Sequence, residues 1–60
     1  MKFWEIVKAL EEGRSVRNKN WNDHLTIKMV DGNIKDTENF RMRLQTIFES
    51  VREGNKWEII

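Results

Sequence analysis

Residues 25–35 read Leu-Thr-Ile-Lys-Met-Val-Asp-Gly-Asn-Ile-Lys, and this stretch decides the class of fold. Apolar side chains occupy positions 25, 27 and 29, which is the alternation of a strand buried on one face. Asp31-Gly32 follows and is a dipeptide typical of tight hairpin turns. The stretch therefore predicts two antiparallel strands, 25–30 and about 33–35, joined by this turn.

An amphipathic helix is expected before the hairpin. Apolar residues at positions 3, 6, 7 and 10 recur with helical spacing, which predicts a helix from Phe3 to Glu12. Gly13 follows, where a helix commonly ends in a left-handed residue. Between this helix and the hairpin, residues 14–17 are short enough to be extended, and the polar residues 18–20 predict a turn.

Residues 40–44 alternate between apolar and basic side chains. The pattern predicts a half-buried strand with a basic outer face. One face would carry Phe40, Met42 and Leu44, and the other Arg41 and Arg43.

The segment after this strand predicts a second, short helix. Thr46-Ile47-Phe48-Glu49 matches the S/T-x-x-E capping box, so the helix is expected to begin at Thr46 and to end at Gly54. One long helix over residues 37–53 is the alternative, because neither proline nor glycine interrupts that stretch. The position of the capping box in its middle favours a strand followed by a helix. Residues 57–60 predict a short closing strand.

These elements predict an α+β fold in one small domain, residues 1–60. An N-terminal amphipathic helix would pack on a small antiparallel sheet, with a short second helix before the C-terminal strand. The 60 residues include no cysteine and one histidine, so neither a disulfide nor a four-ligand zinc site can supplement a small core. We therefore expect a homo-oligomer. Trp4 lies off the apolar stripe of the first helix and is the candidate interface residue, with packing on its own C-terminal strand as the equal alternative.

Charge and composition narrow the classes of partner. The formal net charge is +1, which gives no general attraction to nucleic acid or anionic lipid. No apolar run approaches the ~20 residues of a membrane span. Nucleic-acid binding is therefore a third, disfavoured interpretation, and we expect a cytoplasmic protein without a membrane partner. The cations that would serve nucleic-acid binding are Arg14, Arg17, Lys19, Arg41 and Arg43.

Catalysis is not expected. His24, beside Asp23, is the single histidine, and a surface or interface role fits it better than acid-base work. The sequence has no catalytic cysteine, no phosphate-binding loop and no nucleophile elbow. The acidic residues between positions 31 and 38 lack the spacing of a calcium loop. We predict no catalytic residue, no metal site and no cofactor.

One constellation is suited to binding a nucleotide. Three cations precede an aromatic residue within eight positions, and an amide and a carboxylate follow it. Cations bind phosphate, an indole stacks on a base, and amide or carboxylate groups bond ribose or base edges. The alternative is a purely structural interpretation, in which the cations are ordinary surface charges and Trp21 fills the core. The candidate ligand-binding residues are Arg14, Arg17, Lys19, Trp21, Asn22 and Asp23.

The same region resembles a known family. Ala9-Leu10, Gly13, Val16-Arg17 and Trp21-Asn22 fit the pattern A-L-x-x-G-x-x-V-R-x-x-x-W-N, and the ending Trp57-Glu58-Ile59 is also similar. The pattern opens a family of small phage and prophage proteins, some of which are Thoeris anti-defence proteins of the second type. The resemblance covers about the first 23 residues and the last four. Asn18 stands where these relatives often have a second arginine.

The resemblance implies a function without catalysis. It implies a small α+β protomer that assembles into a homo-oligomer in the host cytoplasm and sequesters a cyclic ADP-ribose-type immune signal. Trp21 would lie near the ligand, and Arg17 matches the first of the family's paired arginines. A protein of another class is the alternative: an inhibitor that covers the surface of a host or defence enzyme, as anti-CRISPR and host-takeover proteins do.

Overall fold

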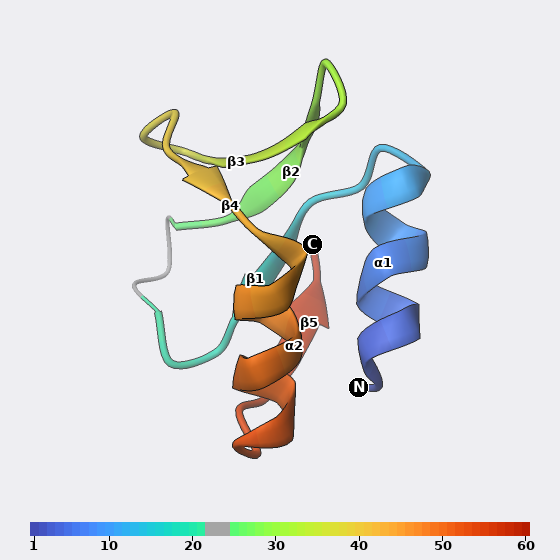
Figure 1. Cartoon of the computed structure of the whole chain (residues 1–60), viewed down its shortest axis with the longest axis vertical. Helices are drawn as coiled ribbons and strands as arrows, with labels where there is room; N and C mark the ends of the chain where they lie inside the picture. The colour runs from blue at the N-terminus through green and yellow to red at the C-terminus, as the bar shows by residue number, and fades with distance from the viewer. Residues whose placement is uncertain (22–24) are drawn as a thin grey trace.

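The computed structural model describes residues 1–21 and 25–60, and within them it confirms the expected α+β fold. An N-terminal helix precedes an antiparallel sheet, and a second helix precedes the last strand (Figure 1). No helix in these two segments is long and apolar enough to cross a membrane. The elements are α1 (Phe3–Glu11), β1 (Val16–Asn18), β2 (Ile27–Val30), β3 (Asn33–Asp36), β4 (Arg41–Met42), α2 (Leu44–Arg52) and β5 (Trp57–Ile59).

The hairpin expected from residues 25–35 forms the middle of the sheet. The strand order is β4-β3-β2-β1-β5, and every neighbouring pair is antiparallel. In the turn, Asp31 has φ 50° and Gly32 has φ 81°. Two consecutive positive φ angles match the twist of the flanking strands, and glycine adopts such a conformation without a steric cost. The Asp-Gly turn is thus confirmed, with Val30 paired to Asn33 beside it.

One face of the sheet is apolar and packs against the helices. The pairs Val16↔Ile27 and Val16↔Ile59 place these side chains on the same face, and Ile34 and Trp57 lie on it too. Figure 1 shows α1 and α2 beside each other against β1 and β5, with the β2 and β3 hairpin extending beyond them. The buried apolar residues are Ile6, Ala9 and Leu10 of α1, Ile47 of α2, and Val16, Ile27, Ile34 and Trp57 of the sheet.

The opposite face of the sheet carries charged residues. Arg17 of β1 stands opposite Glu58 of β5, and Lys28 of β2 stands opposite Lys35 of β3. Lys35 is in turn opposite Arg41 on β4. Like charges directly opposite each other in a sheet are destabilising. The register therefore balances charge at the β5 edge and accumulates positive charge toward the β4 edge.

The second helix begins earlier than the capping-box motif predicts. Its N-cap is Arg43, with extended backbone and no side-chain cap, and its first helical residue is Leu44. The amide of Thr46 donates to the carbonyl of Arg43 at 3.1 Å, so Thr46 lies inside the first turn. This start places Ile47 fully inside the core, so burial of the apolar side overrides the local motif. The long-helix alternative is also wrong, because β4 pairs with β3.

The predicted strand over residues 40–44 is shorter than expected, and its burial pattern is only partly right. Met42 packs against the core from the two-residue strand β4. Phe40 is 67% exposed and Leu44 is 46% exposed, so the proposed apolar face is wrong at both ends. Phe40 lies before β4 and Leu44 is the first residue of α2, so neither follows the alternation of a strand. Asn18, expected in a turn, is instead the last residue of β1.

Ile47 gives a direct test of the core. Replacing Ile47 with Ala should lower the free energy of unfolding by about 2–5 kcal/mol, because it removes a fully buried side chain and leaves a cavity between α2 and the sheet. Urea denaturation followed by tryptophan fluorescence measures the change. Leu44→Ala on the same helix is the matched control and should cost much less, since Leu44 is 46% exposed. Equal losses for the two variants would contradict this packing of α2.

Candidate functional site

Arg17, on β1, connects the neighbouring strand β5 to the backbone of Trp21. Its Nη1 forms an ion pair with Oε1 of Glu58 at 2.6 Å, and its Nη2 donates to the carbonyl oxygen of Trp21 at 3.0 Å. The Arg17 side chain is only 12% exposed. Glu58 offsets much of the charge that Arg17 would present to a phosphate. The geometry gives Arg17 the role of positioning Trp21.

Trp21 is half-buried, and several contacts fix it. Its amide donates to the carbonyl of Asn18 at 2.9 Å, which closes the turn after β1. Its ring meets the ring of Trp57 edge to face, with centroids 5.1 Å apart and planes at 74°. Trp21 therefore packs against the core, as the structural interpretation expected, while part of its surface stays accessible to solvent. An indole held in this way needs little reordering to stack on a planar ligand.

A buried amide supports both tryptophans. Asn18 is 5% exposed, and its Nδ2 donates to Oγ of Ser50 on α2 at 3.1 Å. The indole Nε1 of Trp57 donates to the same hydroxyl oxygen at 3.3 Å. Asn18 Oδ1 accepts the amide of Asn20 at 2.9 Å and so stabilises the turn that leads to Trp21. We call Asn18, Ser50 and Trp57 the amide cluster.

The other predicted ligand-binding residues lie at two separate places. Lys19 is exposed in the turn before Trp21. Its backbone amide donates to the carbonyl of Lys56 at 2.8 Å. This bond brings a second exposed lysine, Lys56, to the same end of the sheet. Arg14 is exposed at the end of α1, where its amide donates to Ala9. The length of β1 separates Arg14 from Trp21, so one protomer does not bring them together. Asn22 and Asp23, like His24, lie outside the described residues.

Trp4 stays on the surface. Its side chain is 60% exposed, and it lines a shallow hollow with Lys8 of its own helix and Ile59 of β5. Trp4 and the C-terminal strand thus border the same hollow, and the strand does not cover the Trp4 side chain. Its exposure suits the predicted contact with a second subunit.

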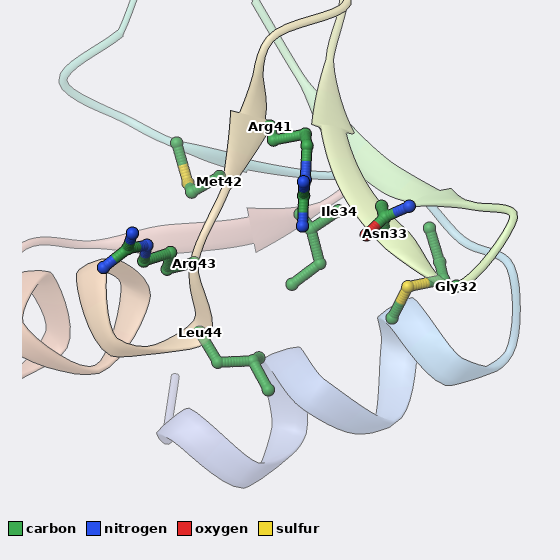
Figure 2. A pocket seen from close by; sticks show the side chains of 8 residues that line it. Gly32, Asn33, Ile34, Arg41, Met42, Arg43 and Leu44 are labelled. Carbon is green, nitrogen blue, oxygen red and sulfur yellow. The ribbon is translucent and has the colours of Figure 1, made fainter.

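A second hollow contains residues that the sequence analysis left as a solvated strand face. It has a volume of about 570 Å³ and lies at the β4 edge of the sheet (Figure 2). Arg41, Met42 and Arg43 follow one another along its border, where the chain passes from β4 to the start of α2. The sequence signal was the Arg-Met-Arg alternation, but only the path of the chain from β4 into α2 shows that the pattern borders a hollow. We call this hollow the β4 groove; its lining is Met29, Gly32, Asn33, Ile34, Arg41, Met42, Arg43 and Leu44.

Across residues 1–21 and 25–60, no group of three histidine, cysteine or acidic side chains is close enough to hold a metal ion. Two separate features could accept a ligand: the partly exposed indole of Trp21 with its neighbouring lysines, and the β4 groove. Comparison of the chain with protein-family models, with curated proteins and with solved structures gave no match.

The amide cluster predicts a specific loss of stability. Replacing Ser50 with Ala should lower the free energy of unfolding by about 1–3 kcal/mol, because the Asn18 amide is left buried without this acceptor. Chemical denaturation measures the loss. Exposed Thr46 on the same helix supplies the control, and Thr46→Ala should change stability by less than about 0.5 kcal/mol. A Ser50→Ala protein as stable as the parent would show that the cluster contributes nothing.

Proposed function

We propose that the protein is a non-enzymatic binding protein of the phage anti-defence type, and that it sequesters a nucleotide-derived immune signal of the cyclic ADP-ribose class in the host cytoplasm. The family resemblance of residues 9–22 motivates the class of ligand. The observation that carries the proposal is the fixed and partly exposed indole of Trp21, with exposed lysines at the same end of the sheet.

The geometry assigns different tasks to the predicted residues. Trp21 would stack on the base through the part of its ring that the edge-to-face contact with Trp57 leaves exposed. Lys19 and Lys56 would attract the phosphates as exposed cations. Arg17 would act indirectly by holding the carbonyl of Trp21. Arg14 can join such a site only from another protomer, which is one reason to couple binding to self-association.

A protein inhibitor of a host or defence enzyme is the second candidate. The specific observation in its favour is the amount of exposed apolar surface on a 60-residue chain. Trp4 is 60% exposed, Phe40 67% and Phe48 44%. Exposed aromatic side chains of this kind commonly mark protein interfaces. An inhibitor would co-purify from host lysate with one protein in fixed stoichiometry, whereas a protein that sequesters a signal would emerge without one.

Self-association is a prediction common to both candidates. The small core and exposed Trp4 lead us to expect a homo-oligomer at micromolar concentration. Sedimentation velocity measures the mass of the assembly, and Trp4→Ala should shift it toward monomer. Phe40→Ala removes another exposed aromatic ring and is the matched control, with no shift expected. A thermally stable monomer of the parent protein would contradict the prediction.

Ligand binding is measured by isothermal titration against cyclic ADP-ribose isomers, cyclic dinucleotides and NAD. Binding of a cyclic ADP-ribose isomer is expected, and Trp21→Ala should weaken it by about 1–3 kcal/mol through lost stacking. Lys19→Gln should weaken it less and make it less sensitive to salt. Circular dichroism of each variant checks that the fold is retained, since Trp21 also contacts Trp57.

The control for this titration is Lys28→Gln, which removes an exposed lysine from β2, away from the turn that holds Lys19. It should leave the affinity within about twofold of the parent value. Absence of binding at millimolar concentrations of every ligand would overturn the proposal. Unchanged affinity in a folded Trp21→Ala protein would remove Trp21 from the site.

A further inference from the structure

The β4 groove combines an apolar lining with basic side chains. Met29, Ile34, Met42 and Leu44 supply its apolar surface, and Arg41, Arg43 and Asn33 supply its polar groups. No acidic side chain lines it. Its volume of about 570 Å³ is within the range of sites that hold small molecules. Because the groove is at the β4 edge and Trp21 is beside β1 and β5, the two features lie toward opposite ends of the sheet.

The side chains that line the β4 groove place a basic group at one side and apolar groups at the other, which suits a ligand with a polar end and an apolar end. Figure 2 shows Arg41 extending from β4 past Ile34 and Asn33, with the side chain of Leu44 on the other side of the hollow. Arg43 extends toward α2 from the next alternate position of the same segment. A ligand lying between Ile34 and Leu44 would therefore have its head group beside Arg41. Methionines in the lining adapt to ligand shape because their side chains are unbranched and flexible.

The described structure shows no ion pair at Arg41. The residue directly opposite Arg41 on β3 is Lys35, so the register brings like charges together. Across residues 1–21 and 25–60 the ion pair that the structure shows is between Arg17 and Glu58, far from this edge. An anion held at Arg41 would relieve this repulsion and form charge-assisted hydrogen bonds with the guanidinium.

We propose that the β4 groove binds a small amphiphilic anion, a molecule with an apolar body and one carboxylate or phosphate head group. The head group pairs with Arg41, and the body lies against Ile34, Met42 and Leu44. Arg43 adds long-range attraction at the end of the groove. This site is independent of the proposed nucleotide site at Trp21.

The test is a titration followed by ¹H–¹⁵N correlation spectra of the full chain. Octyl phosphate and octanoate are the anionic probes, and octyl glucoside, kept below its micelle concentration, is the uncharged one. We expect saturable shifts of amides in residues 29–34 and 41–44 with at least one anionic probe. The comparison of the two anions distinguishes a phosphate from a carboxylate head group. Butyl phosphate should bind at least about tenfold more weakly than octyl phosphate, since it buries fewer methylene groups.

Variants locate the head group. Arg41→Gln should weaken binding of the anionic probe about tenfold, the size expected for one lost charge-assisted hydrogen bond. Arg52→Gln is the matched control, because Arg52 is an exposed arginine at the far end of α2 and does not line the groove. It should change the affinity by less than about twofold. Trp21→Ala should also leave the affinity unchanged, so this result is independent of whether a nucleotide binds at Trp21.

Three results would overturn the proposal. The first is no saturable shift with either anion. The second is equal binding of octyl glucoside and octyl phosphate, which would make the groove a merely apolar surface. The third is equal weakening by Arg41→Gln and Arg52→Gln, which would show that the protein attracts anions through its general charge. Dispersed amide spectra of both variants confirm that they are folded.

Discussion

The buried amide of Asn18 is the interaction on which the arrangement of this protein depends. It lies at the end of β1, and it joins that strand to α2 through Ser50 and to the following turn through Asn20. Ser50 also accepts the indole of Trp57, so one hydroxyl oxygen fixes a helix, a central strand and a closing strand together. In a small core, loss of a partner of this amide is strongly destabilising. A buried amide without hydrogen-bond partners costs more free energy than its hydrogen bonds contribute.

The two candidate sites follow from the way the helices cover the sheet. Both helices pack on one apolar face, and the Trp21 turn is fixed where β1 and β5 meet the end of α2. At the other edge, β4 is only two residues long and the chain enters α2 at once. Met42 reaches the core there while Leu44 stays half-exposed, which leaves the hollow that Arg41 borders. Tight packing at one edge and incomplete covering at the other therefore give the molecule two surfaces of different chemistry.

Sequence patterns predicted those elements whose signals are local. The alternation in residues 25–30, the Asp31-Gly32 turn and the apolar stripe of residues 3–10 each specify an element within a few residues, and each is present. The start of α2 was predicted wrongly, because the capping-box motif at Thr46 competes with burial of Ile47, and burial is worth more. The pattern at Phe40 and Leu44 failed for a related reason, since alternation indicates burial only where the chain remains a strand.

For the candidate sites, the sequence by itself determined the residue types: a tryptophan after three cations, and two arginines around a methionine. It also determined that neither disulfides nor four-ligand zinc could support the fold, since the needed side chains are absent. Tertiary structure alone decided how those residues are used. Pairing of β1 with β5 brings Glu58 to Arg17 across 41 positions and makes that arginine a support for Trp21. Pairing of β3 with β4 sets Arg41 opposite Lys35 and Met42 opposite Ile34, because strand register, which no local pattern encodes, fixes which distant side chains become neighbours.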